Sequence, residues 1–177
     1  VVGDSIPAGP LKTVEGKKFD LNAAAKAQRL AIIYYRGGWC PYCNAHLAQL
    51  QEAEPELREL GYRIVAISPD QPSKMKESLE KGAMTYTLLS DASMETAKAF
   101  GVAFEVDAAT IKKYAEYGID LEAASGESHH LLPVPAVFLV GTNGVIDFAY
   151  SNPDYKVRLE PAALLAAAKA AVEADNP

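Results

Sequence analysis

Two hydrophobic patterns alternate along the chain. Short uninterrupted apolar runs, typical of strands buried on both faces of a sheet, occur at Ala31–Tyr35, Tyr62–Ser68 and Ala136–Val140. Between these runs, apolar residues recur every three or four positions, as they do on one face of a helix. The alternation predicts an α/β protein with a mixed central sheet flanked by helices.

Capping residues, prolines and glycines mark the ends of the predicted helices. The helices are expected at Asn22–Gln28, from Cys40 to about Leu60, at Pro72–Gly82, from an Asp91 or Ser93 cap to about Phe100-Gly101, at Ala108–Tyr117 between Asp107 and Gly118, and from Pro161 through Ala162–Ala174. Pro55 lies inside the second helix and lacks a backbone N–H, so we expect a kink near Gln51. Asp70 is expected to act as a helix N-cap.

Further strands are expected at Leu11–Val14, Lys18–Leu21, Thr85–Leu89 and Val145–Tyr150. Asn143-Gly144 lies between two apolar runs and predicts an antiparallel hairpin there. The polar stretch Asp120–His130 carries no such pattern, and with the helix before it we expect an insertion or lid. The first 30 residues are expected to be peripheral.

Composition narrows the class of protein. A length of 177 residues favours one domain over residues 1–177, and 49% hydrophobic residues fill a core, which argues against disorder. A net charge of −6 without a basic cluster argues against nucleic-acid binding. Every apolar run is far shorter than the roughly 20 residues that a membrane crossing requires. The chain opens on Val1, so removal of a leader stays open.

The most informative feature is the cysteine pair in Trp39-Cys40-Pro41-Tyr42-Cys43, which follows a predicted strand and opens a helix. A disulfide that closes so short a loop stabilises a protein by only about 2 kcal/mol, so reversible redox chemistry explains the spacing better than a structural staple. The first turn of a helix favours a thiolate and lowers the pKa of Cys40. Cys43 lies one turn further on the same face, close enough to attack an oxidised Cys40.

Metal and nucleotide binding have weaker support. His46 would add a third ligand type after Cys43, but a structural zinc site takes four ligands, and His129 and His130 are the only other histidines. His46 is otherwise a half-buried helix residue or a charged neighbour that tunes the thiols. Gly37-Gly38 lacks the spacing of a phosphate-binding loop. We therefore expect neither a metal nor a cofactor.

The segment from Tyr34 to Cys43, Tyr-Tyr-Arg-Gly-Gly-Trp-Cys-Pro-Tyr-Cys, resembles the active-site segment of the thioredoxin-like peroxiredoxins, the alkyl hydroperoxide reductase and thiol-specific antioxidant group. Further motifs share this resemblance: Ile67-Ser68-Pro69-Asp70, Leu89-Ser90-Asp91, Leu132–Phe138 and, as in a peroxiredoxin-like subgroup, Asp154–Pro161. The resemblance implies a thioredoxin-like fold with an N-terminal extension and a helical insertion before a cis-proline strand. It identifies Pro135 as that cis-proline, which helps to position substrates. Trp39 and Pro41 beside Cys40 are further candidates for substrate positioning, and Trp39 also for local packing and a partner contact surface.

The departures from the family pattern leave two interpretations open. That pattern is Pro, three residues, Thr or Ser, two residues and the peroxidatic Cys; aligned on Cys43, Arg36 replaces the Pro and Cys40 the Thr. Either Cys40 attacks and Cys43 resolves, or Cys43 is the peroxidatic residue. Exposure and the helix end favour Cys40. Leu131–Val140 lacks the family's arginine, so Arg36 and Arg158 are the candidates to replace it, with surface salt bridges as their alternative roles.

The resemblance implies a thiol-dependent peroxidase that reduces hydrogen peroxide or organic hydroperoxides and is recycled by thioredoxin or a similar dithiol. A thioredoxin-type protein disulfide reductase is the alternative, because the Trp-Cys-Pro-Tyr-Cys sequence is intact. A non-enzymatic redox-sensing or metal-binding module is a second alternative. A homodimer is compatible with the sequence. The use of cysteine predicts a cytoplasmic location, with an exported origin kept open.

Overall fold

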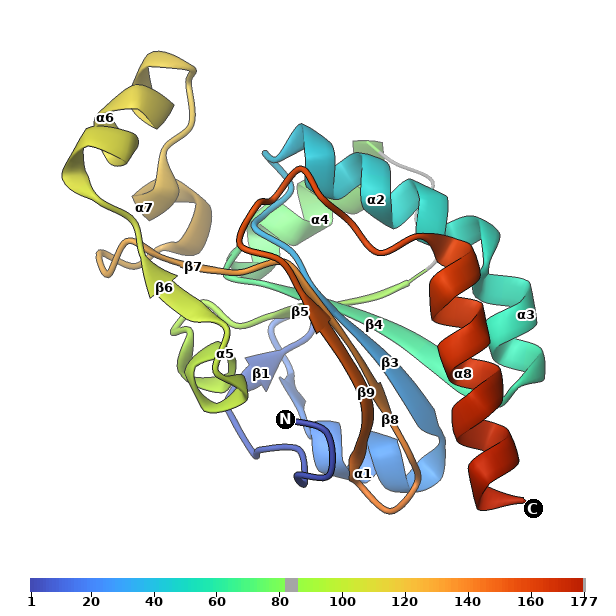
Figure 1. Cartoon of the computed structure of the whole chain (residues 1–177). Helices are drawn as coiled ribbons and strands as arrows, with labels where there is room; N and C mark the ends of the chain where they lie inside the picture. The colour runs from blue at the N-terminus through green and yellow to red at the C-terminus, as the bar shows by residue number, and fades with distance from the viewer. Residues whose placement is uncertain (82–85, 177) are drawn as a thin grey trace.

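The computed structural model describes residues 1–81 and 86–176, and its centre is a seven-stranded mixed sheet (Figure 1). In spatial order the strands are β2 (Lys18–Phe19), β1 (Leu11–Lys12), β5 (Thr87–Ser90), β4 (Tyr62–Ser68), β3 (Arg29–Tyr34), β8 (Ala136–Val140) and β9 (Ile146–Ser151). Strands β3, β4 and β5 are parallel, whereas β8 is antiparallel to β3 and to β9. The mixed sheet and the β8–β9 hairpin are confirmed. The N-terminal strands are less peripheral than expected, because β1 pairs with β5.

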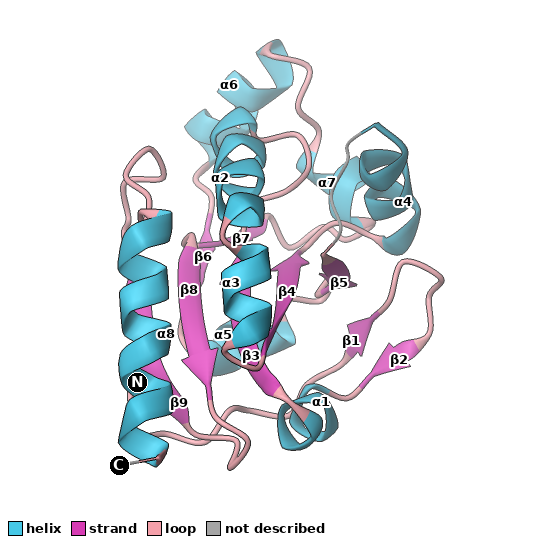
Figure 2. Cartoon of the chain, turned by 90° about the vertical axis from the view of Figure 1, so that its right-hand side faces the viewer, coloured by secondary structure: helices cyan, strands magenta, loops and turns pink. Residues whose placement is uncertain are grey.

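Helices cover both faces of the sheet. They are α1 (Leu21–Ala27), α2 (Pro41–Glu52), α3 (Glu54–Glu59), α4 (Pro72–Lys81), α5 (Glu95–Phe100) and α8 (Pro161–Asp175). Figure 2 shows α2, α3 and α8 in front of the sheet. Helices α1 and α5 contribute to the core on the other face. Alternate residues of β3 explain the two layers: Ala31 packs in the core under α2 and α8, and Ile32 in the core that includes α1 and α5.

The long helix predicted after Cys40 is divided in two. Helix α2 ends at Glu52 and α3 begins at Glu54, and the Ala53 N–H between them bonds the Leu50 carbonyl. The expected kink near Gln51 is therefore a full break two residues later. Pro55 accounts for the break, because in the first turn of α3 its missing N–H leaves no intrahelical bond unmade.

The predicted insertion is confirmed and carries more regular structure than the sequence suggested. It contains β6 (Ala103–Glu105), α6 (Ala108–Glu116), α7 (Leu121–Ser125) and β7 (Leu131–Pro133), with β6 antiparallel to β7. Helix α7 lies within the stretch expected to be irregular; its Asp120 cap accepts the Ala123 N–H at 3.0 Å. Figure 1 shows the insertion projecting to one side of the sheet.

Several predicted helix ends agree with the structure, with one difference at α5. Asp107 caps α6, and Gly101 in a left-handed conformation ends α5. The residue at the N-cap position of α5 is Met94, while Asp91 reaches past it and accepts the N–H groups of Thr96 and Ala97. Gly82 and Thr85, which were predicted to end a helix and begin a strand, lie outside the described residues. Across the described ranges, no helix combines the length and the apolar character needed to cross a bilayer.

Candidate active site

The cysteine pair lies where β3 passes into α2. Cys40 occupies the N-cap position of α2, and Pro41 follows at the first helical position, where its fixed φ suits the helix. The Sγ atom of Cys40 accepts the backbone N–H of Cys43 at 3.3 Å, and the two Sγ atoms are 2.6 Å apart. Both cysteines are free thiols. A thiol and a thiolate in this arrangement can exchange two electrons by forming one disulfide.

The two thiols have very different acidities. The hydrogen bond from the Cys43 thiol, supported by the Cys43 N–H and by the charges of Arg36 and Arg158, overcomes the effect of burial and lowers the pKa of Cys40 to about 6. Burial and the same bond to Cys40 raise the pKa of Cys43. At neutral pH the pair therefore holds one proton and one negative charge, and the charge is on Cys40.

Exposure does not distinguish the two cysteines. Cys40 is 1% exposed and Cys43 is fully buried, and both belong to the hydrophobic core beneath α2 together with Tyr35 and Leu47. The expectation that Cys40 is the exposed member is wrong, because the N-cap sulfur turns inward to accept the Cys43 N–H. The N–H of Cys43 at the helix end still favours a thiolate on the buried Cys40.

Arg158 reaches the pair from the segment between β9 and α8. Its Nη2 lies 3.3 Å from the Cys43 Sγ, and its Nε donates to the Tyr155 carbonyl. The same Sγ accepts the backbone N–H of Arg36 at 3.4 Å. The sulfur of Cys43 therefore faces two donors besides its contact with Cys40.

The Arg36 side chain is buried among aromatic rings. Its guanidinium carbon lies 4.3 Å from the ring centre of Tyr155, 5.1 Å from Trp39 and 5.5 Å from Tyr114, and it donates a hydrogen bond to the Tyr114 hydroxyl. Among the described residues, no carboxylate forms an ion pair with Arg36 or Arg158. Neither arginine therefore forms a surface salt bridge with a described residue. Both guanidinium charges lower the pKa of Cys40.

The insertion contacts the site through α6. Tyr114 of α6 packs on Trp39 with ring centres 5.7 Å apart, and Trp39 also packs against the small core of Val106, Leu121 and Leu132. Sequence reasoning did not single out Tyr114 or Tyr155. An aromatic residue on a polar helix or loop carries no signal of its own, and only the fold brings these two rings to Arg36.

Asp70 supports the loop before the cysteines instead of capping a helix. Its Oδ2 accepts the Gly38 N–H at 2.8 Å and the Ser68 hydroxyl at 3.2 Å. Burial, only partly offset by these bonds, raises the pKa of Asp70 to about 6. The expected N-cap role is wrong because Asp70 precedes α4 by two residues and turns toward Gly38.

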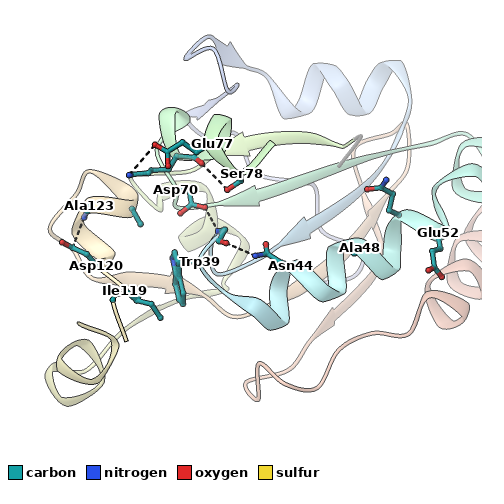
Figure 3. A pocket seen from close by; sticks show the side chains of 15 residues that line it. Trp39, Asn44, Ala48, Glu52, Asp70, Glu77, Ser78, Ile119, Asp120 and Ala123 are labelled. Carbon is teal, nitrogen blue, oxygen red and sulfur yellow. Dashed lines mark hydrogen bonds and ion pairs between the residues drawn. The ribbon is translucent and has the colours of Figure 1, made fainter. Parts of the chain in front are cut away.

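A groove of about 860 Å³ opens beside this loop (Figure 3). It is bordered by α2, α4 and the start of α7, and neither cysteine lines it. Its lining residues are Gly38, Trp39, Asn44, Ala48, Gln51, Glu52, Asp70, Lys74, Glu77, Ser78, Gly118, Ile119, Asp120, Ala123 and Ala124.

The histidines hold segments in place. His46 is buried, its Nε2 donates to the Leu159 carbonyl at 2.9 Å, and burial lowers its pKa. His129 bridges the Ala92 carbonyl and the Leu131 N–H, and His130 pairs with Glu122. In the described part of the chain, His, Cys, Asp and Glu side chains nowhere gather in a group of three or more suited to a metal ion.

Pro135 differs from what the resemblance implied. No peptide bond within residues 1–81 and 86–176 is cis, so the bond before Pro135 is trans. The short link between β7 and β8 closes without a cis bond, since the Val134 N–H donates to the Val102 carbonyl at 2.7 Å. Trans is also the usual state of a bond before proline.

Comparison with known proteins places this site in a family. The sequence profile of the AhpC/TSA family matches residues 2–149. A putative peroxiredoxin bcp of Haemophilus influenzae is 33% identical over 101 residues, which cover 57% of this chain and 64% of the relative. Peroxiredoxin Bcp of Escherichia coli is 30% identical over 100 residues, or 56% and 64% of the two chains. The match thus spans slightly less than two thirds of these relatives' length.

Solved structures extend the likeness in fold to nearly the whole chain. Peroxidoxin BcpB of Mycobacterium tuberculosis superposes with a TM-score of 0.73 at 20% identity and covers 98% of this chain and 96% of its own. Bacterioferritin comigratory protein of Xanthomonas campestris, whose structure was described for its alkyl peroxide reduction activity, gives a TM-score of 0.71 at 21% identity over 96% and 99% of the two chains. The fold is the thioredoxin-like fold of the peroxiredoxins, and the chain belongs to the AhpC/TSA family.

Proposed function

We propose that the protein is a thiol-dependent peroxidase that reduces hydrogen peroxide or organic hydroperoxides. The observation that carries the proposal is the thiol pair itself: an acidic Cys40 hydrogen bonded to Cys43 and held beside two guanidinium groups that form no ion pair with a described carboxylate. A thiolate is the form of cysteine that attacks peroxides. The relatives named peroxiredoxin, and the alkyl peroxide reduction described for the Xanthomonas campestris protein, support the same activity.

In the first step, the Cys40 thiolate attacks one oxygen of the peroxide and the O–O bond breaks. Cys40 becomes a sulfenic acid, and the other oxygen leaves as water or an alcohol after it takes a proton. Cys43 then attacks the sulfenic sulfur, a disulfide forms and the hydroxyl group leaves as water. An external dithiol returns two electrons and restores both thiols.

Arg158 and Arg36 stabilise the charges that appear in these steps. A guanidinium near the sulfurs favours the thiolate and the negative charge that develops on the peroxide oxygen. Trp39 and Pro41 flank Cys40 and position the incoming substrate. We propose the same for the buried Pro135, through its place before β8 and with a trans bond.

The donors around Cys43 keep its role as the first attacker open. Its Sγ faces Arg158 and the Arg36 N–H. The resemblance to the family pattern also implies that Cys43 stands at the peroxidatic position. If the proton moves from Cys43 to Cys40, the same two donors stabilise a thiolate on Cys43. We favour Cys40, because its sulfur accepts the N–H and the S–H of Cys43 at the helix end.

The reductant in this proposal is thioredoxin or a similar dithiol, and the reaction takes place in the cytoplasm, where dithiol systems keep thiols reduced. The homodimer stays a prediction that sedimentation analysis would test.

A protein disulfide reductase is the second candidate function, favoured by the placement of Trp39-Cys40-Pro41-Tyr42-Cys43 at a helix N-terminus.

Stopped-flow oxidation of the fully reduced protein tests the proposal. Trp39 is the only tryptophan and reports the reaction by fluorescence, with hydrogen peroxide and cumene hydroperoxide as substrates. We expect oxidation orders of magnitude faster than that of a free thiol, lost in Cys40→Ser. In Cys43→Ser, oxidation should stop at a sulfenic acid that dimedone traps. Loss of the fast reaction in Cys43→Ser alone would assign the attack to Cys43, and a wild-type rate no faster than a free thiol would favour disulfide exchange.

A further inference from the structure

The groove beside the cysteines has the form of a channel along α2. Its lining residues on that helix, Asn44, Ala48 and Gln51-Glu52, fall at helical spacing. The opposite wall comes from α4. Helix α2 has 12 residues and is about 18 Å long, the length of about five residues of extended chain. A peptide segment matches this shape better than hydrogen peroxide does.

The charges that line the groove are mostly negative. Glu52, Asp70, Glu77 and Asp120 contribute carboxylates, against the single lysine Lys74. Lys74 pairs with Glu77 at 3.8 Å and its charge also acts on Asp70, so one cation faces four carboxylates along the groove. An occupant with basic groups would complement this wall, and an acidic one would be repelled.

Apolar surface accompanies these charges. Trp39 and Ile119 lie near each other at one end of the groove (Figure 3). The small residues Ala48, Ala123 and Ala124 also line it. The walls thus combine an aromatic anchor, small residues and acidic groups. A segment that alternates apolar and basic side chains fits this combination.

Asp70 offers a free acceptor at the base of the groove. The side chain is 3% exposed, and both of its hydrogen bonds, from Gly38 and from Ser68, go to Oδ2. No described residue donates to Oδ1, and Figure 3 shows the carboxylate among the side chains that face the groove. A carboxylate oxygen that faces the groove without a donor from a described residue can accept a hydrogen bond from the occupant, from an N–H of a peptide backbone or of a basic side chain.

The groove ends beside the loop that precedes the redox pair. Gly38 and Trp39, the two residues before Cys40, form its inner end, and Asn44 of α2 donates to the Gly38 carbonyl at 2.8 Å. A segment bound along α2 therefore ends against the residue next to Cys40. That is where a second protein must present a thiol to a Cys40–Cys43 disulfide.

We propose that the groove between α2 and α4 docks an extended, basic and apolar segment of the protein dithiol that reduces this protein. The proposal rests on the function proposed above. The docked reductant's thiolate attacks the Cys40 sulfur, and the Cys40–Cys43 bond breaks with Cys43 leaving as a thiolate that takes a proton. The second thiol of the reductant then attacks the mixed disulfide, which releases Cys40 as a thiolate and leaves the reductant oxidised.

Peptide binding tests the chemistry of the groove without any turnover. The probes are two fluorescently labelled, capped pentapeptides, one of alternating leucine and lysine and one of alternating leucine and glutamate, titrated with the protein and followed by anisotropy. We expect the lysine peptide to bind at least about tenfold more tightly than the glutamate peptide. Equal binding of the two peptides, or no binding of the lysine peptide, would overturn the proposal.

Substitutions locate the binding. Ala48→Trp fills the groove and Glu52→Lys reverses a charge in it, and both residues are exposed, so the helix tolerates the changes. The matched controls are Gln49→Trp on α2 and Glu59→Lys on α3, also exposed but outside the groove. We expect the groove variants to weaken the lysine peptide by about fivefold or more and to raise the KM for thioredoxin, while the controls do neither. Equal losses in the controls would contradict the location.

Two readouts separate this proposal from the proposed function. Single-turnover oxidation by hydrogen peroxide reports the peroxidase chemistry alone; if it is slow in the wild type, the proposed function fails whatever the peptides do. If it is fast but Ala48→Trp leaves the KM for thioredoxin unchanged, only the docking proposal fails. A rise in the KM for cumene hydroperoxide instead would assign the groove to the organic substrate and overturn the docking proposal.

Discussion

At the scale of single residues, the site depends on one negative charge shared by two sulfurs. The charge is on Cys40 because its Sγ accepts two hydrogen bonds from Cys43, the thiol and the backbone N–H. Burial works against that charge and would raise the pKa of an isolated thiol. The positive charges of Arg158 and Arg36 stabilise the buried thiolate and offset part of the effect of burial.

The reduction potential of the pair should therefore change slope with pH near 6. Below that pH the reduced pair binds two protons, and the potential falls by about 59 mV per pH unit; above it Cys40 is a thiolate, and the fall is about 30 mV per unit. Equilibration with glutathione between pH 4.5 and 8.5 measures the curve. In Arg158→Ala the change of slope should move to higher pH, because a positive charge that favours the thiolate is lost.

Arg63→Ala is the control for that experiment. Arg63 also donates a side-chain hydrogen bond, to Thr87, but it lies on β4 away from the cysteines. Its substitution should leave the change of slope where it is. A single slope of about 59 mV per unit across the whole range would show that neither thiol is acidic, and would contradict the assigned thiolate.

Asp70 should make the protein less stable as the pH rises. Its pKa is about 6 in the folded protein against 3.8 in the unfolded chain, so between these values the folded state binds more protons and the free energy of unfolding falls with increasing pH. Asp70→Asn removes this dependence and still accepts the Gly38 N–H. Its advantage over the wild type should grow from about pH 4 to about pH 7, toward a limit of about 3 kcal/mol.

Urea unfolding of the reduced proteins measures this difference. Asp91, whose pKa burial also raises, is present in both proteins and cancels in the comparison. Asp120→Asn makes the same chemical change at an exposed helix cap and should show no such growth. Parallel stability curves for wild type and Asp70→Asn would mean that Asp70 is already ionised at pH 4.

At the scale of elements, the contact between the insertion and the site predicts that the insertion acts as a lid. Tyr114 connects α6 to the site through its ring contact with Trp39 and its hydrogen bond with Arg36. Tyr114→Ala should loosen this lid, so that a bulky fluorescein maleimide labels Cys40 several times faster, while the small reagent iodoacetamide gains much less. Tyr114→Phe keeps the ring and should label almost as slowly as the wild type.

Tyr117→Ala controls for the loss of an aromatic residue at the end of the same helix. Tyr117 is 69% exposed, so its substitution should not change labelling by either reagent. If Tyr114→Ala accelerates both reagents equally, the variant has changed the reactivity of the thiolate and not its accessibility. That result would show that the insertion does not limit the access of reagents to Cys40.

The elements also show what sequence patterns can and cannot predict. Strands β4 and β8 have the predicted bounds, because a continuous apolar run between turn residues has few other solutions in a protein of this size. Helix α7 was missed, since five residues are too few to show a period. The break at Ala53 was placed two residues early, because the position of a proline fixes which hydrogen bond is lost but not how the chain adjusts.

Some features of the site could likewise be predicted from the sequence, and others could not. The acidity of Cys40 depends mainly on local sequence, because the Cys43 thiol and the Cys43 N–H that lower its pKa lie three residues on, in the first turn of a helix. Arg158 was a candidate only by chemistry and resemblance, and its contact with Cys43 depends on a segment 115 residues away in the chain. Tyr155 and the groove along α2 depend on how separate elements pack together, and no pattern within one element predicts that.

At the scale of the whole molecule, the charge of the protein should make its reduction by a dithiol protein sensitive to salt and leave its oxidation by hydrogen peroxide insensitive. The chain carries a net charge of −6, and carboxylates outnumber lysine along the proposed docking groove. Long-range attraction acts on a basic protein partner but not on neutral hydrogen peroxide, and salt shortens the range of that attraction from about 10 Å at 0.1 M to about 3 Å at 1 M. Reduction of the disulfide by a dithiol protein with a basic docking segment should therefore slow several-fold between 20 mM and 500 mM NaCl, as measured by stopped-flow Trp39 fluorescence.

Oxidation by hydrogen peroxide should change little over the same range of salt, and so should reduction by dithiothreitol, which is neutral and needs no groove. Glu52→Lys should flatten the salt dependence of the protein reductant, whereas Glu59→Lys, with the same effect on net charge, should leave most of it in place. If both variants flatten it equally, the net charge of the molecule steers the partner and the groove does not. A rate that rises with salt would mean that apolar contact dominates docking, because salt would then strengthen the association instead of screening it.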